Sequence, residues 1–168
     1  MDSINSLANS SQTLLSLSSS FLDIVGKKCC RQRVGEYKSL TLGFGEKVFH
    51  SRKKSIDPFS GEWEIGTYCS AWRIVKSEQI VCGSMDPVDS LNELDEKLSS
   101  VEFGSVVGIK MLSKFDIRFE LDNDINIEFI CATDYDDEVV FIFGPNNLYI
   151  QYSLNEGWQI GKSNEPWV

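Results

Sequence analysis

Apolar residues recur at helical spacing near the start of the chain. Residues 10–25 place four of them three or four positions apart, which would form one apolar stripe on a helix: Leu14, Leu17, Phe21 and Ile24. Gly26 is a suitable C-terminal stop. The basic segment 27–33 that follows is expected to be exposed to solvent after the helix ends. The pattern therefore predicts an N-terminal helix over residues 10–25.

A second helix is predicted near residues 87–99. Asp86 is a suitable N-cap, and Pro87 suits the first helical position. Glu93 and Lys97 have the order and spacing of an i,i+4 ion pair. Three leucines would line the buried face of this helix: Leu91, Leu94 and Leu98.

Most of the remaining chain alternates apolar and polar residues with a period of two, which is typical of half-buried strands. The clearest example is residues 115–130, where two alternating runs flank a turn at 122–124 and predict a hairpin with one charged face. The unbroken apolar run 139–143 predicts a central strand. Further strands are expected at residues 40–44, 63–65, 68–75, 80–82, 101–111, 148–154 and 158–160.

These patterns predict an α+β fold of mostly antiparallel β-sheet, with the N-terminal helix and the helix near residues 87–99. The 168 residues suit one domain, which we expect to span 1–168 with a β-rich body at 37–160. Trp63, Trp72 and Trp158 stand in strand patterns and are expected in the core. Trp167 near the C-terminus is a candidate for exposure.

Charge is distributed unevenly along the chain. The formal net charge is −9, but residues 1–85 carry 8 acids and 11 bases, whereas residues 86–168 carry 17 acids and 5 bases. Residues 116–138 alone hold 9 acids and one base, Arg118. Such a field repels nucleic acid and anionic membranes and attracts basic partners. The simpler interpretation, that the acids only keep the chain in solution, remains open.

The sequence predicts no metal site and no disulfide framework. It contains five cysteines without a CxxC pair, and only one histidine, so zinc ligation is not expected. Cys69, Cys82 and Cys131 lie in apolar strand-like runs and are expected to be buried. An acidic loop at 134–138 could bind Ca²⁺, but it lacks the ligand spacing and glycine of an EF-hand loop.

No catalytic residue or cofactor is predicted. The single histidine, His50, precedes Ser51 and the basic run 52–54, a neighbourhood typical of a solvated loop. GxSxG, P-loop and GxGxxG motifs are absent.

The N-terminus lacks the basic region of a secretory signal, and no apolar run approaches the length of a membrane span. We therefore expect a soluble, cytoplasmic protein in a reducing compartment that binds neither membrane nor nucleic acid. A membrane-surface helix with acylated Cys29 and Cys30 remains an alternative.

Residues 61–160 contain an ordered set of short motifs. A W-R hairpin at 72–73 ends in G-S-x-D at 83–86, and after the leucine-spaced helix come a D-I-R-F strand at 116–119 and a late G-W at 157–158. This order resembles small bacterial immunity proteins that are encoded beside polymorphic or contact-dependent growth-inhibition toxins.

The resemblance implies a protein that binds its toxin tightly and covers the active site or an essential surface. Many such toxins are basic nucleases, so an acidic inhibitor would associate quickly. We expect six acids to form the partner-binding face: Asp122, Asp124, Asp134, Asp136, Asp137 and Glu138.

Two other functions remain open. One is a small-ligand-binding β-rich domain, whose sign would be a deep pocket lined by Trp and Tyr. The other is a two-carboxylate enzyme, whose sign would be two buried acids in a cleft.

Overall fold

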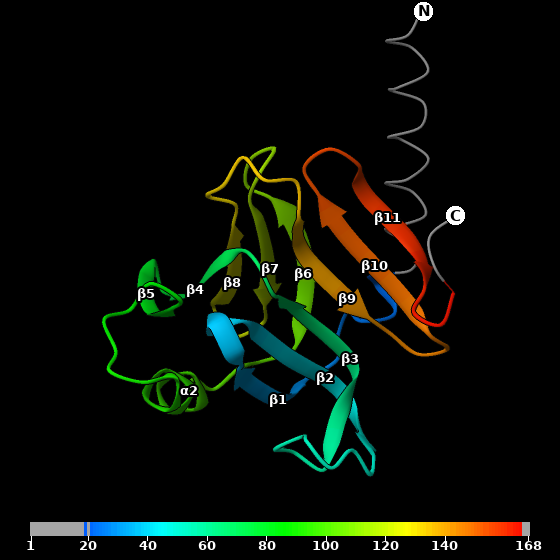
Figure 1. Ribbon diagram of the computed structural model, residues 1–168, viewed down its shortest axis with the longest axis horizontal. Coiled ribbons are helices and arrows are strands. Elements are labelled where there is room, and N and C mark those ends of the chain that lie inside the picture. The colour runs from blue at the N-terminus through cyan, green and yellow to red at the C-terminus, as the bar shows by residue number, and fades with distance from the viewer. Residues whose placement is uncertain (1–18, 20, 166–168) are drawn as a thin grey trace, which may run out of the picture.

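The computed structural model describes residue 19 and residues 21–165, which form two antiparallel sheets (Figure 1). The first sheet has six strands in the order β1-β2-β3-β9-β10-β11. Their bounds are β1 Cys29–Val34, β2 Leu40–Phe49, β3 Phe59–Thr67, β9 Glu138–Phe143, β10 Leu148–Ser153 and β11 Gly157–Lys162. The predicted central strand at 139–143 is confirmed as β9, which lies between β3 and β10.

The second sheet has five strands in the order β5-β4-β8-β7-β6. Their bounds are β4 Ala71–Lys76, β5 Gln79–Gly83, β6 Val106–Met111, β7 Ile117–Leu121 and β8 Ile125–Ile130. The predicted hairpin of residues 115–130 is confirmed as β7–β8, with Asp124 at a left-handed φ of 61° in its turn. The antiparallel β-rich architecture predicted from the sequence is therefore correct.

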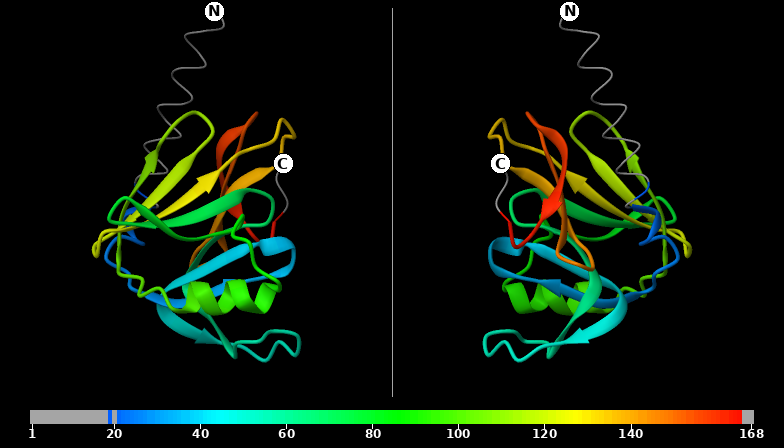
Figure 2. Two further views of the ribbon diagram at one scale, coloured as in Figure 1. Left: turned by 90° about the vertical axis from the view of Figure 1, so that its left-hand side faces the viewer. Right: turned by 90° about the vertical axis from the view of Figure 1, so that its right-hand side faces the viewer.

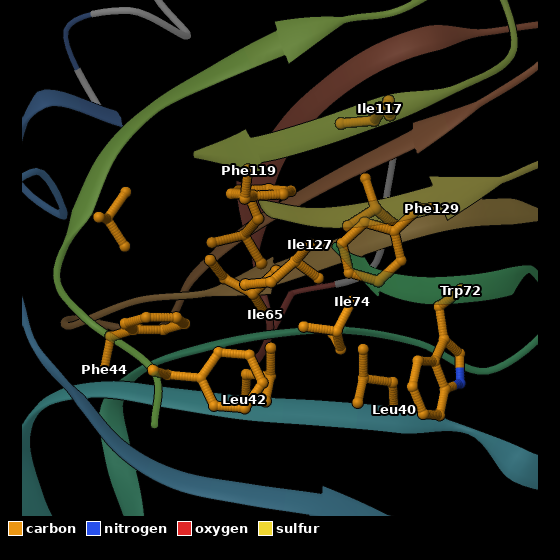
Figure 3. Close-up of a cluster of buried hydrophobic side chains, with 14 of the residues drawn as sticks. Leu40, Leu42, Phe44, Ile65, Trp72, Ile74, Ile117, Phe119, Ile127 and Phe129 are labelled. Atoms are coloured by element: carbon orange, nitrogen blue, oxygen red, sulfur yellow. The ribbon is translucent and has the colours of Figure 1, made fainter. Parts of the chain in front are cut away.

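One hydrophobic core lies between the two sheets, as Figure 3 shows. The first sheet contributes Leu40, Leu42, Phe44 and Ile65, and the second contributes Trp72, Ile74, Ile117, Phe119, Ile127 and Phe129. The alternation seen in the sequence explains this arrangement, because every second side chain of a strand points to the same face. Trp63 and Trp72 are buried as predicted and Trp158 is half-buried, whereas Trp167 lies outside the described residues.

The helix predicted near residues 87–99 is confirmed as α2, which spans Leu91–Ser99 and starts later than predicted. Ser90 is its N-cap, and its hydroxyl accepts the Glu93 amide. Asp86 and Pro87 precede the helix, and the Lys97 ammonium pairs with Asp86 rather than with Glu93. Ser90 is favoured over Asp86 as the N-cap, because Glu93 in the first turn after Ser90 also accepts the Asp89 amide, at 3.0 Å.

The N-terminal helix predicted at residues 10–25 is not confirmed. Residues 10–18 and 20 lie outside the described part of the chain, and residues 23–26 form a turn. Phe21 and Ile24 of the predicted stripe are nevertheless buried in the core.

The basic segment 27–33 was predicted to be solvated, and this was wrong. It forms most of β1, the edge strand beside β2, and α2 lies along it (Figure 2). Gln32 ties the two together, because its amide donates to the carbonyls of Leu98, at 3.2 Å, and Val101, at 2.8 Å. Residues 29–33 are all half-buried, so this strand has no alternation of burial that the sequence could have shown.

A second difference concerns residues 68–70, which were predicted as part of a strand. They form a bend between β3 and β4, where the chain passes from the first sheet to the second. The Thr67 hydroxyl accepts the amides of Cys69 and Ser70 and so fixes this bend.

Candidate functional site

The structure does not gather the six predicted partner-binding acids on one face. Asp122 and Asp124 lie in the β7–β8 turn, whereas the other four follow β8 in the β8–β9 connection and at the start of β9. β8, whose six residues extend over about 17 Å, lies between the two groups in the chain.

Asp122 and Asp124 hold the β7–β8 turn against neighbouring segments. Asp122 Oδ1 accepts the Ser105 amide at 2.8 Å, and Asp124 Oδ2 accepts the Ser77 hydroxyl at 2.8 Å. These bonds give both carboxylates a structural role in the second sheet.

The acids of the β8–β9 connection differ from Asp122 and Asp124 in their surroundings. Asp134, Asp136 and Asp137 are exposed, and none forms an ion pair with a base in the described part of the chain. Asp136 accepts the Asn155 amide at 3.1 Å, and Asp137 accepts the Cys69 thiol at 3.2 Å. These two hydrogen bonds hold the β8–β9 connection in place, whereas no ion pair among the described residues neutralises its three aspartates.

Two cysteine predictions were wrong. Cys69 is exposed in the β3–β4 bend, and Cys131 is half-buried, whereas Cys82 is buried as expected. Partial burial and the hydrogen bond to Asp137 raise the pKa of the Cys69 thiol to about 11. The thiol is therefore protonated at neutral pH and is a weak nucleophile.

Four large side chains are unusually exposed beside this acidic connection. They are Tyr68 at 60%, Tyr135 at 74%, Met85 at 85% and Tyr37 at 92%. Tyr37, Tyr68 and Met85 border a hollow of about 280 Å³ that is also lined by Ala132 and Thr133. We call these four side chains, together with Asp134, Asp136 and Asp137, the junction surface, because they lie where the chain crosses between the sheets.

Backbone strain accompanies the exposure of Tyr37. The short helix η1, Glu36–Lys38, has left-handed φ angles of 55° at Tyr37 and 58° at Lys38, which cost about 1–2 kcal/mol each. The indole N–H of Trp72 donates to the Lys38 carbonyl at 2.7 Å and holds this conformation. A strained backbone that a buried residue holds in place, and that keeps an aromatic ring exposed, is typical of a functional surface.

The outer face of the six-stranded sheet carries a row of aromatic rings. Tyr68 stacks on Phe141 and Phe143 stacks on Tyr149, both with ring centroids 4.8 Å apart, and 5.3 Å separates Phe141 from Phe143. The row lies along β9, and Tyr68 joins it to the junction surface. A groove of about 640 Å³ runs over this face, which we call the outer groove.

Two carboxylates lie near the aromatic row. Burial raises the pKa of Glu64, even though its two oxygens accept the Gly61 amide at 2.6 Å and Arg31 at 3.2 Å. Burial also raises the pKa of Glu138, and the charge of Asp137 adds to this effect. Glu138 Oε2 accepts the Tyr149 hydroxyl at 2.7 Å, but its Oε1 is buried without a hydrogen-bond partner among the described residues.

His50, the single histidine of the chain, lines the outer groove. Its backbone amide donates to the Pro58 carbonyl at 3.0 Å, and its Nδ1 is buried without a partner in the described structure. Within the described residues no hydrogen bond joins its side chain to a nucleophile or a carboxylate. The loop around His50 was predicted to be solvated, but His50 itself is half-buried.

The arginines of β1 are neutralised within the fold. Asp57 accepts from both Arg31 and Arg33 at 2.8–2.9 Å, and Asp95 of α2 accepts from Arg33 at 2.8 Å. The hydrogen bond from Arg33 is the main cause that lowers the pKa of Asp57. Both arginines of β1 are thus paired, whereas Asp134, Asp136 and Asp137 of the β8–β9 connection form no ion pair among the described residues.

A second network crosses the outer face of the five-stranded sheet. Glu128 of β8 is 1% exposed and pairs with Arg73 of β4 and Arg118 of β7. Burial acts to raise the pKa of Glu128, but the two guanidinium groups outweigh it and hold this pKa below its usual range. The register places all three residues opposite one another, so the network joins three strands.

Among the described residues no cluster of three or more potential ligands could hold a metal ion. No helix in this part of the chain has the length and apolarity needed to cross a membrane.

The sequence did not indicate the apolar members of the junction surface. Tyr37, Tyr68, Met85 and Tyr135 lie in four separate connections, and no periodic pattern links them. The only available signal was Tyr135, which stands between Asp134 and Asp136 in an otherwise polar loop.

Comparison with protein-family models, with curated proteins and with solved structures found no match to this chain. Its function must therefore be inferred from the junction surface and the outer groove.

Proposed function

We propose that this chain is a binding protein that neutralises a basic protein toxin by covering the active site or an essential surface of the toxin. The junction surface is the observation that carries this proposal. It combines exposed tyrosines and a methionine with uncompensated acids, and it surrounds a hollow large enough to seat a protruding side chain. Tyrosine and methionine are enriched at the centres of protein interfaces.

The charges favour a basic partner. Asp134, Asp136 and Asp137 are exposed and form no ion pair among the described residues, so their negative charge faces solvent. Such a field accelerates the encounter with a positively charged surface and rejects acidic ones. Asp122 and Asp124 lie at the far end of β8 and would contribute only at longer range.

Binding of a small ligand is the second candidate, and the outer groove favours it. The groove has aromatic walls formed by Tyr68, Phe141 and Phe143, and its lining includes His50, whose Nδ1 has no hydrogen-bond partner among the described residues. The two-carboxylate enzyme has less support, because Glu62 pairs with Lys27 at 3.0 Å and Glu64 is held by Arg31 and Gly61.

The protein proposal is tested with a loop triple variant, Asp134→Asn, Asp136→Asn and Asp137→Asn. The full chain is used to capture proteins from its host, and each captured protein is expressed to find one that arrests growth. We expect co-expression of the wild-type chain to restore growth, and the loop triple variant to lose at least tenfold of this protection.

A matched control removes three charges elsewhere. Glu46, Glu78 and Glu102 are exposed and form no ion pair among the described residues, so their change to Gln gives the same net charge. This control triple variant should protect as well as the wild type. If both variants lose protection equally, net charge alone causes the effect and the junction surface is not required. If none of the captured proteins arrests growth, the proposal is contradicted.

A further inference from the structure

The far end of the β2–β3 hairpin carries a group of exposed bases. Four of them form no ion pair among the described residues: Lys47, Arg52, Lys53 and Lys54. The segment 46–58 also contains two acids, Glu46 and Asp57. Glu46 is exposed, whereas Asp57 is already paired with two arginines of β1. This hairpin end is therefore positively charged, in a chain whose formal net charge is −9.

Large apolar side chains are exposed among these bases. They are Val48 at 50%, Phe49 at 71% and Ile56 at 81%, with Pro58 exposed beside them. The ammonium of Lys47 lies 4.5 Å from the centre of the Phe59 ring, so a base and an aromatic side chain are held together here. We call residues 47–58 the basic tip.

The basic tip projects from the rest of the molecule. Figures 1 and 2 show this hairpin end, in cyan, extending beyond α2, and they place the β8–β9 connection at the opposite end. β2, whose ten residues extend over about 33 Å, begins just after Tyr37 of the junction surface and ends in the basic tip. Because salt screens exposed charges beyond about 8–10 Å, the acids of the junction surface do not cancel the positive charge of the basic tip.

The shape of the basic tip favours a lipid bilayer over other anionic partners. A stable protein interface buries about 800 Å² on each side, which a narrow projecting loop does not offer. Nucleic acid supplies phosphates, but aliphatic side chains such as Val48 and Ile56 do not stack on its bases. A bilayer supplies anionic headgroups above an apolar layer and needs no matching shape, so an apolar tip surrounded by bases can enter it end-on.

We propose that the basic tip docks this chain on the surface of an anionic lipid bilayer. Phe49 and Ile56 enter the boundary between headgroups and acyl chains, and the bases at 52–54 contact lipid phosphates. The expectation from the sequence that the chain avoids membranes rested on its net charge, which the fold keeps apart from the basic tip. This docking is independent of the proposed toxin partner, because the junction surface stays accessible on the docked chain.

The test is sedimentation of the full chain with vesicles of phosphatidylcholine alone, or of phosphatidylglycerol and phosphatidylcholine mixed one to three. We expect at least tenfold tighter binding to the anionic vesicles, and weaker binding as salt is added.

A basic triple variant, Arg52→Gln, Lys53→Gln and Lys54→Gln, locates the charge effect. It should bind the anionic vesicles at least tenfold more weakly, since each base near such a surface contributes about fivefold. The matched control is Lys76→Gln, Lys110→Gln and Lys114→Gln, which changes three exposed bases without an ion pair among the described residues. It has the same net charge and should bind within twofold of the wild type.

Insertion of the apolar side chains is tested separately. The double variant Phe49→Ser and Ile56→Ser should bind at least fivefold more weakly, whereas Ile80→Ser with Val107→Ser, at positions 59% and 51% exposed, should bind as the wild type does. Thermal unfolding of each variant establishes that the fold is retained. Phe49→Trp should add fluorescence that lipids with brominated acyl chains quench.

Several results would overturn the proposal. They are equal binding to both kinds of vesicle, equal losses in the basic and control triple variants, and an unaffected Phe49→Ser and Ile56→Ser variant. Self-association of the wild type that the basic triple variant loses would assign the basic tip to a second copy of the chain instead. Binding of a single-stranded oligonucleotide in place of vesicles would assign it to nucleic acid.

Discussion

At the scale of single residues, Asp137 sets the chemistry of its neighbour Cys69. The thiol donates to this carboxylate at 3.2 Å, and the negative charge adds to the effect of partial burial in raising the thiol pKa to about 11. The same carboxylate also accepts the amide of Glu138 and so helps to shape the β8–β9 connection.

The expected consequence is that Asp137→Asn lowers the Cys69 pKa and speeds alkylation of this thiol. A rate increase of about fivefold at pH 8 would correspond to a fall of roughly 0.7 in the pKa. Iodoacetamide labelling followed by peptide mass spectrometry measures it at Cys69 alone. Asp134→Asn is the control, because Asp134 makes no contact with the thiol, and equal rates in the two variants would refute this explanation.

At the scale of elements, the row Arg73–Glu128–Arg118 joins β4, β8 and β7. Removing a buried partner from such a row leaves opposed charges without compensation. Because Arg73 is 42% exposed and Arg118 is 27% exposed, water screens part of this cost.

We predict that Glu128→Gln lowers the free energy of unfolding by about 2 kcal/mol at pH 7. The native pKa of Glu128 lies below the unfolded value of 4.5, so its contribution is complete above pH 4.5 and is lost as the pH falls through the native pKa. The variant should therefore lose stability less steeply than the wild type on acidification. Urea unfolding across this pH range measures both effects, and Glu120→Gln on β7 is the control; a similar loss in Glu120→Gln would contradict the prediction.

The sequence predicted those elements whose signal is local. The alternation in β7 and β8 and the apolar run of β9 identified strands, because side-chain period and burial agree there. β1 was missed because Arg31 and Arg33 occupy its outer face, where Asp57 and Asp95 compensate them from distant parts of the chain. A partner 24 to 62 residues away leaves no local pattern.

The start of α2 was misplaced for a related reason. Asp86 and Ser90 are both suitable N-caps, and local propensity does not separate them. Asp86 instead accepts the Gly83 amide and pairs with Lys97, which only the folded β5–α2 connection allows.

At the scale of the whole molecule, the structure shows that three of the acids of the C-terminal half, Asp134, Asp136 and Asp137, are exposed together in the β8–β9 connection. Lys27, Arg31 and Arg33 of the N-terminal half pair with acids inside the fold, and those pairs do not reach the β8–β9 connection. Tyr37, Tyr68 and Met85 come from connections that are far apart in the chain and border the same hollow as Ala132 and Thr133 of the β8–β9 connection. This convergence depends on how the two sheets meet, so the sequence predicted the acids but not the apolar surface around them.

The most direct test of the account is amide hydrogen exchange of the full chain, alone and in complex with the growth-arresting protein that it captures. We predict that binding slows exchange in residues 68–70 and 131–137, which carry the junction surface, and leaves the β6–β7 hairpin unchanged. Slowed exchange confined to the β6–β7 hairpin, with residues 68–70 and 131–137 unaffected, would contradict the claim that the junction surface binds the partner.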